Sequence, residues 1–194
     1  MKILLTLFVL LFSSSVFAKE YKSIIGFKAN IPDDFMVITS INKNDVRDVF
    51  QENNFDIDLY DELLSGIDLT NIELIIDPNN LTENYNFNTV PVPYFKINNA
   101  FLDEVCDYYQ ELYTQMIGRN IPQYACEISN LPGHNGKSLY VVHEGFFDPG
   151  YYLIQYQFFL KNKNEYITFS HNCEKSNCNN TDKIMKSILR SIHY

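Results

Sequence analysis

The eighteen residues at the N-terminus constrain the fold of this chain most, because they have the features of a leader that lies outside the folded domain. Lys2 supplies a short positive segment, and the run Ile3–Phe12 contains a single polar residue. Val16-Phe17-Ala18 then places compact residues at the cleavage positions of a signal peptide. The apolar run of about ten residues is too short to cross a bilayer about 30 Å thick. We therefore expect a signal peptide over residues 1–18 and a periplasmic or secreted mature chain beginning at Lys19.

The rest of the chain, residues 19–194, has the size of a single domain. It contains no later apolar run long enough for a transmembrane helix, so we expect no membrane span after signal removal. Without Lys2 it has 14 of the 15 Lys and Arg residues against 24 Asp and Glu, a formal charge of −10. A negative field repels nucleic acid and anionic lipid and attracts basic partners. Solubility alone is the simpler explanation of this charge.

Four cysteines in an exported chain predict two disulfides. They are Cys106, Cys126, Cys173 and Cys178, and four cysteines allow three connectivities. We favour the pairs Cys106–Cys126 and Cys173–Cys178, because the members of each pair are close in sequence and fall at the edges of predicted elements. The larger loop would then contribute roughly 3 kcal/mol and the smaller one roughly 2 kcal/mol to stability.

Hydrophobic periodicity divides the first half of the mature chain into short strands and helices. Alternation predicts three strands: Ser23–Pro32, Phe35–Ile41 and Asn71–Asp77. Helical spacing predicts one helix from Asp45, capped by Asn44, and a second around Leu59–Leu64. The polar stretch Asn79–Asn88 predicts a loop that is the most mobile segment. Two prolines limit Val90–Ile97 to an edge strand at most.

The second half has stronger patterns. Asn99–Ile117 has an apolar stripe and an acidic opposite face, which predicts a helix ended by Gly118. Four strands in an antiparallel meander follow: Gln123–Asn130, Ser138–Phe147, Tyr151–Leu160 and Glu165–Ser170. In the third of them, Gln155 and Gln157 lie on the face opposite the apolar residues. Thr181–Ile192 predicts a closing helix. Helices beside an antiparallel sheet make an α+β domain.

Several segments together carry a family resemblance: Phe27-Lys-Ala-Asn-Ile-Pro32 before a strand, hairpins around Asn135-Gly136 and Asn162–Asn164, Ile167-Thr-Phe-Ser170, and Ser187-Ile-Leu-Arg-Ser191 in the closing helix. This pattern resembles the PsbP-like superfamily, which includes the extrinsic photosystem II protein and many exported bacterial proteins. The likeness covers most of residues 23–194. It implies an α/β/α sandwich with a central antiparallel sheet, and accessory or binding roles more often than catalysis. The four-cysteine framework departs from the family pattern.

One cluster has the ligand types of a soft metal site, namely His171, Cys173 and Cys178. A zinc site needs four ligands, whereas this segment supplies three, and a disulfide-closed loop beside a histidine explains the same residues. A Cys–His nucleophile pair also requires a free thiolate. The sequence has no serine-hydrolase elbow, zincin helix, phosphate-binding loop or dinucleotide fingerprint. We therefore expect no cofactor, and the sequence favours a non-enzymatic role.

Aromatic residues near one predicted turn suggest an interaction patch. Phe146, Phe147, Tyr151 and Tyr152 flank the turn between two strands at one end of the sheet. The leading hypothesis is a noncatalytic exported accessory or protein-binding domain that engages an envelope or extracellular protein through a sheet edge or this aromatic surface. One alternative is a periplasmic small-ligand or metal-binding protein. A second alternative is a hydrolase with carboxylates paired in space, which sequence alone does not reveal.

Overall fold

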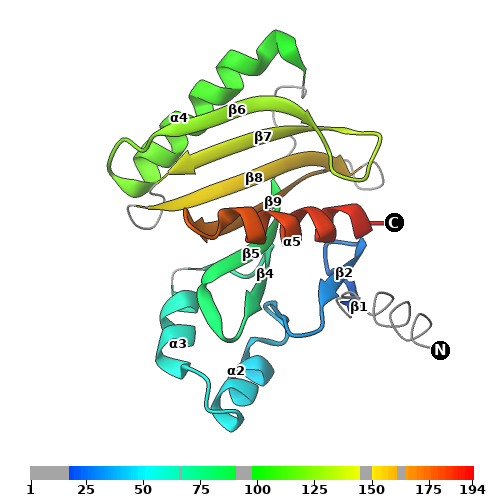
Figure 1. The fold of residues 1–194 in the computed structure, drawn as a ribbon, viewed down its shortest axis with the longest axis vertical. Helices are drawn as coiled ribbons and strands as arrows, with labels where there is room; N and C mark the ends of the chain where they lie inside the picture. The colour runs from blue at the N-terminus through cyan, green and yellow to red at the C-terminus, as the bar shows by residue number, and fades with distance from the viewer. Residues whose placement is uncertain (1–17, 66, 91–97, 145–149, 161–164) are drawn as a thin grey trace, which may run out of the picture.

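The fold is built on a seven-stranded antiparallel sheet (Figure 1). The computed structural model describes residues 18–65, 67–90, 98–144, 150–160 and 165–194. The strand order is β3-β4-β5-β9-β8-β7-β6. These strands are β3 (Met36–Ile38), β4 (Ile72–Asp77), β5 (Asn80–Val90), β6 (Gln123–Asn130), β7 (Lys137–Glu144), β8 (Tyr151–Leu160) and β9 (Glu165–Glu174). A separate hairpin consists of β1 (Ala18–Lys22) and β2 (Lys28–Pro32).

Helices flank both faces of this sheet. They are α2 (Lys43–Glu52), α3 (Ile57–Ser65), α4 (Leu102–Ile117) and α5 (Cys178–Ser191). Alternation along β8 explains the layering, since Ile154, Tyr156 and Phe158 pack in the cluster that includes α5. Leu153 points the other way and packs in the cluster that includes α4. The α2–α3 pair covers the β3–β4 end of the face on which α4 lies. The predicted α+β sandwich is confirmed.

The helix α4 matches its predicted bounds closely. A 3₁₀ turn η2 (Asn99–Phe101) precedes it, and the Asn98 side chain caps this turn by accepting from the Ala100 amide at 2.9 Å. Gly118 ends the helix with a φ of 72°, which glycine adopts without strain. The α4 tyrosines also bond to the sheet. Tyr109 Oη lies 2.8 Å from Gln157 Oε1, and the Tyr113 hydroxyl donates to Gln155.

The prediction of a mobile loop at Asn79–Asn88 is wrong. This segment forms most of β5, which pairs with β4 on one side and β9 on the other. Tyr85 and Phe87 are buried in the core beneath α5. The asparagines that alternate with them face the opposite way, where Asn86 and Asn88 lie across from Ser170 and Thr168 of β9. The polar side chains therefore belong to one face of a strand.

The predicted strand Ser23–Pro32 is interrupted by a turn. Ser23 donates its amide to the Phe27 carbonyl at 2.9 Å, and Gly26 has a φ of 100°. The carboxylate of Glu73, fully buried in β4, accepts from Tyr21 Oη at 3.1 Å, Ser23 Oγ at 2.8 Å and the Ile24 amide at 2.5 Å. One buried side chain thus fixes the hairpin against the sheet.

Other element boundaries moved by a few residues. The strand predicted from Phe35 is shorter, because the Asn42 side chain accepts from the Thr39 amide at 2.7 Å and turns the chain into α2. The closing helix begins at Cys178 rather than Thr181, after β9 has continued to Glu174. Most of the predicted edge strand Val90–Ile97 lies outside the described residues. Within the described ranges, no helix is both long and apolar enough to cross a membrane.

Candidate interaction site

The face of β6 and β7 opposite α4 is left open by the helices. The helix α5 makes its main contacts with β9 and β2. In Figure 1, β6 and β7 lie above α5, on the far side of β8 from it. Four tyrosines from three strands share this face, and we call them the tyrosine face: Tyr124, Tyr140, Tyr152 and Tyr156. Their aromatic surface lies beside the outermost strand of the sheet.

The four rings form two contacting pairs. Tyr140 and Tyr156 are direct cross-strand partners with centroids 4.9 Å apart. Tyr124 and Tyr152 meet edge to face, with centroids 5.5 Å apart and planes at 76°. Exposure rises towards the sheet edge, from 4% for Tyr156 to 58% for Tyr124. The face therefore has an anchored inner part and an accessible outer part.

A β-bulge brings Tyr124 onto this face. Ala125 and Glu127 lie opposite Val142 and Tyr140, so strict alternation would point Tyr124 towards α4. The register shifts between Gln123 and Ala125, and the Tyr124 ring consequently meets Tyr152. Sequence periodicity missed Tyr124 because the bulge breaks the period of two. The alternation of its strand places Tyr140 on this face, but the sequence pattern does not distinguish it from aromatic residues of the core.

Charged groups border the tyrosine face. The Tyr124 hydroxyl donates to Glu144, and this bond raises the pKa of Tyr124. Burial, together with the nearby carboxylates of Asp182 and Glu127, raises the pKa of Tyr140 to about 12. The Lys175 Nζ lies 5.6 Å from the centroid of Tyr152, a cation–π distance. The hydroxyls of Tyr124 and Tyr140 therefore stay neutral near pH 7 and lie close to carboxylates.

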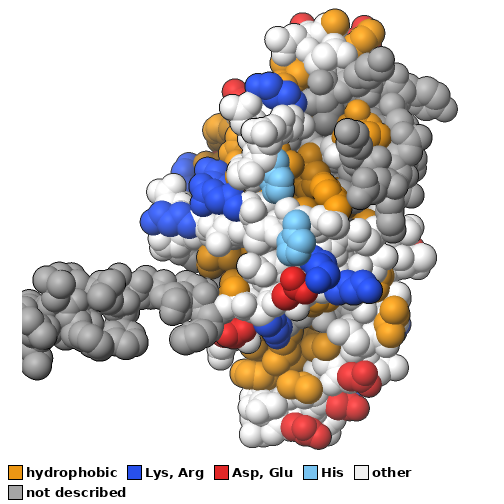
Figure 2. Space-filling model, turned by 90° about the vertical axis from the view of Figure 1, so that its right-hand side faces the viewer, with side chains coloured by type: hydrophobic (Ala, Val, Ile, Leu, Met, Phe, Trp, Pro, Cys, Tyr) orange, Lys and Arg blue, Asp and Glu red, His pale blue; other side chains and the backbone are white. Residues whose placement is uncertain are grey.

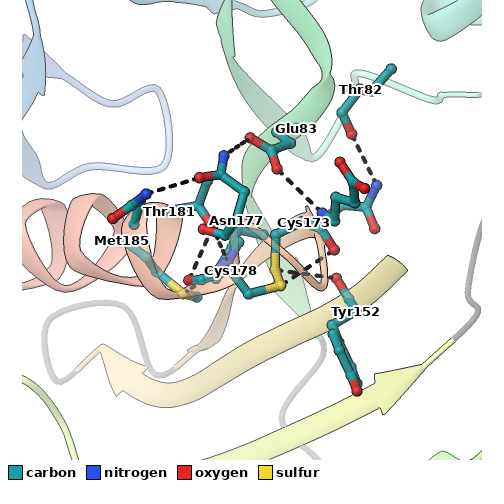
Figure 3. Close-up of a disulfide and its surroundings, with 12 residues drawn as sticks. Thr82, Glu83, Tyr152, Cys173, Asn177, Cys178, Thr181 and Met185 are labelled. Carbon is teal, nitrogen blue, oxygen red and sulfur yellow. Dashed lines mark hydrogen bonds between the residues drawn. A yellow bond between two sulfur atoms is a disulfide. The ribbon is translucent and has the colours of Figure 1, made fainter. Parts of the chain in front are cut away.

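A disulfide anchors the turn that carries Lys175 (Figure 3). Cys173 of β9 lies across from Tyr152 and is bonded to Cys178 at the start of α5, with Cα atoms 5.1 Å apart. Glu83 accepts from the Glu174 amide at 3.2 Å and from Asn177 Nδ2 at 2.6 Å. The turn is therefore held on both sides beside the tyrosine face.

The structure contains both favoured disulfides. The second one joins Cys106 of α4 to Cys126 of β6, with Cα atoms 5.9 Å apart. It lies on the α4 side of the sheet, opposite the tyrosine face. The pairing preferred from the short sequence separations is thus the pairing in the structure, and all four cysteines are bonded.

Of the four aromatic residues predicted as a patch, the structure describes Tyr151 and Tyr152, which lie on opposite faces of β8. Tyr152 is half-buried on the tyrosine face. Tyr151 precedes it on β8, and strand alternation directs its side chain to the other face. Phe146 and Phe147 lie outside the described residues. The turn prediction therefore located one end of the surface, whereas its accessible part comes from β6.

The candidate soft-metal residues have other partners. His171 is fully buried, with Nδ1 2.8 Å from Met185 Sδ and Nε2 3.2 Å from Thr181 Oγ1. Cys173 and Cys178 are bonded to each other. Among the described residues no group of three or more His, Cys, Asp and Glu side chains could hold a metal ion. This cluster therefore has the geometry of a disulfide loop beside a buried histidine.

A hollow at the opposite end of the sheet lacks the groups of a paired-carboxylate site. It is lined by residues 130–135, none of which is acidic. Its one titratable side chain is His134, whose Nε2 lies 2.7 Å from the Leu189 carbonyl oxygen. This hollow therefore gives no support to hydrolysis by facing acids.

Comparisons with known proteins find likeness at the level of the fold. No family model and no curated protein matches the sequence. The solution structure of cyanobacterial PsbP (CyanoP) from Synechocystis sp. PCC 6803 is similar with a TM-score of 0.60 and 10% identity, covering 94% of this chain and 95% of that one. The Ran-binding protein Mog1p of Saccharomyces cerevisiae is similar with a TM-score of 0.54 and 11% identity, covering 92% and 96%. The resemblance to the PsbP-like fold is confirmed.

Proposed function

We propose that this protein is an exported, noncatalytic accessory domain that binds another protein through its tyrosine face. The observation that carries the proposal is four tyrosines on an open sheet face, with exposure rising to 58% at Tyr124. Aromatic side chains are enriched at interfaces, and tyrosine is common among the residues that dominate binding energy. The fold likeness to a Ran-binding protein supports a binding role.

The compartment is part of this proposal. A leader over residues 1–18 and two disulfides agree with an oxidising compartment outside the cytoplasm. The partner is then a periplasmic or extracellular protein. Mass spectrometry of the chain recovered from the cell envelope should give an N-terminus at Lys19, and an intact N-terminus would contradict export by cleavage.

Site-directed crosslinking tests the binding surface. A photo-crosslinking residue at position 124 should capture a partner, which is then identified and purified for direct binding. Tyr124→Ser should weaken that binding at least fivefold, since removing an aromatic side chain that dominates an interface costs more than about 1 kcal/mol. Tyr108→Ser is a matched control, because Tyr108 is 52% exposed but lies on α4. Equal effects of the two substitutions would contradict the assignment of this face.

A polar region on the other sheet face favours a second candidate, small-ligand binding. Thr168 Oγ1, Asn172 Oδ1 and His143 Nδ1 are buried without hydrogen-bond partners among the described residues. Unpaired buried polar groups are costly and suit a polar ligand. Native mass spectrometry should then find an adduct that is lost in Asn172→Leu, and an unchanged adduct would exclude this region.

A further inference from the structure

We propose that the partner presents an extended basic segment, which adds as a further strand to the open edge of β6. This inference rests on the proposed function and specifies the chemical class of its partner. It follows from the edge strand, from the covalent support beneath that strand, and from the charges beside it.

The strand β6 is an unusually open edge. It is the last strand of the sheet, and in the described part of the chain no strand pairs with its outer side. It is eight residues long, whereas β3 at the other edge has three. Native sheets commonly protect such edges with Lys, Pro or very short strands. The sequence of β6 contains neither Lys nor Pro, and its one charged residue is Glu127.

The edge is also held in place before any partner arrives. Cys126 lies within β6 and is bonded to Cys106 of α4. The inner side of β6 pairs with β7 from Gln123 to Asn130. Strand addition uses the backbone of a sheet edge, and a fixed edge loses little freedom on binding. This support lies on the α4 side and leaves the tyrosine face accessible.

The charges and aromatic rings beside the edge of β6 favour a basic partner. Tyr124 and Glu127 of β6 are both exposed on the tyrosine face. Glu144 accepts from the Tyr124 hydroxyl, and Glu127 lies near Tyr140. Asp182 also lies near Tyr140 but is paired with Lys186 at 2.6 Å, so Glu127 and Glu144 are the acids available to a partner. The Lys175 Nζ lies at a cation–π distance from the Tyr152 ring, a geometry that an aromatic ring on this face offers to a cation. Alternate side chains of an added strand would reach this aromatic and acidic surface.

Binding of a designed peptide to the oxidised full mature chain tests this proposal. The probe is a capped eight-residue peptide that alternates Lys and Val, compared with one that alternates Glu and Val. A third peptide keeps Lys but has N-methyl groups on alternate residues, which blocks strand pairing. The Lys peptide should bind at least tenfold more tightly than either other peptide, and it should slow hydrogen exchange of β6 amides.

Substitutions then locate the contact. Tyr124→Ser and Glu127→Gln should each weaken binding of the Lys peptide at least threefold. Asp107→Asn is the matched control, since Asp107 is an exposed acid on α4, and it should change binding less than twofold. Equal binding of the Glu peptide, equal effects of Asp107→Asn, or exchange protection away from β6 would each overturn the proposal.

The two proposals fail in different ways. A crosslinked partner that binds through Tyr124 with a neutral or acidic segment would overturn the basic-segment inference and leave the tyrosine face as the docking surface. A partner whose binding is unaffected by Tyr124→Ser would overturn the proposed function itself. The peptide experiments and the crosslinking experiment therefore separate these outcomes.

Discussion

At the scale of single residues, two buried histidines couple folding to pH. His143 and His171 are both fully buried, and burial lowers the pKa of each to about 4. An unfolded histidine has a pKa near 6.5. The unfolded chain therefore binds more protons between pH 6.5 and pH 4. The stability that neutral histidines provide is present above pH 6.5 and is lost as the pH falls towards 4.

We expect His143→Gln to reduce this acid sensitivity. Each histidine contributes a slope of about 1.4 kcal/mol per pH unit in that window, so the variant should lose one such slope. Urea unfolding at pH 7, 5.5 and 4.5 measures the effect as a difference from the unsubstituted chain. His193→Gln is the control, because His193 is exposed. Parallel curves for the unsubstituted chain and His143→Gln would contradict the prediction.

At the scale of elements, the Glu73 carboxylate joins the β1–β2 hairpin to β4. Desolvation raises its pKa, although the bonds from Ser23, Ile24 and Tyr21 oppose this shift. The folded chain therefore keeps the Glu73 carboxyl protonated at pH values somewhat above the ordinary pKa of a glutamate. The contribution of Glu73 to the free energy of unfolding falls as the pH rises from that ordinary pKa to the raised one. Glu73→Gln should consequently gain stability relative to the unsubstituted chain as the pH rises above about 4.5. A relative stability that falls over that range, measured by urea unfolding, would contradict this direction.

The two disulfides should differ in what they stabilise. Replacing both Cys106 and Cys126 by Ser should cost about 3 kcal/mol, because that bond closes the longer loop. Replacing Cys173 and Cys178 should cost about 2 kcal/mol. Hydrogen exchange should increase in β6 for the first pair and around the start of α5 for the second. Exchange that rises equally over the whole sheet in both variants would indicate global destabilisation instead.

Sequence patterns predicted those elements in which a single period runs uninterrupted. The helix α4 and strands β7 to β9 have clear periods of 3.6 or 2, and their positions were predicted to within a few residues. The position of β6 was also predicted, although a bulge interrupts its period. The strand β5 was missed because its asparagines resemble loop composition, although Tyr85 and Phe87 alternate with Asn84, Asn86 and Asn88. The outer part of the candidate site was missed for a related reason, since a bulge redirects Tyr124. The alternation in β5 was therefore present in the sequence, whereas the bulge at Tyr124 depends on strand pairing that the local sequence does not record.

At the scale of the whole molecule, the charges are segregated by helix. Acids outnumber bases on α2, α3 and α4, whereas α5 carries Lys183, Lys186 and Arg190 against one acid, Asp182. Figure 2 shows most basic side chains (blue) at mid-height, with some acidic ones (red) beside them, and a further group of acidic side chains near the bottom, at the level of α2 and α3. The full sequence has a formal net charge of −9. Long-range attraction should therefore influence how fast a basic partner arrives.

We expect the association rate constant of the Lys peptide to fall at least tenfold between 50 mM and 500 mM salt. The dissociation rate constant should change much less, because close contacts are screened weakly. Stopped-flow fluorescence with a labelled peptide measures both. A dissociation rate that carries most of the salt dependence would contradict this account.

The last residues of the chain are joined to the first hairpin. Lys28 and His193 exchange two backbone hydrogen bonds, of 2.8 and 2.9 Å. The fourteen residues of α5 separate this junction from the Cys173–Cys178 turn by about 20 Å, at 1.5 Å per residue. Tyr194 is therefore a suitable tether point. A chain immobilised through it on a biosensor surface would keep Lys175 and Tyr152 at the far end of α5, in the flowing solution.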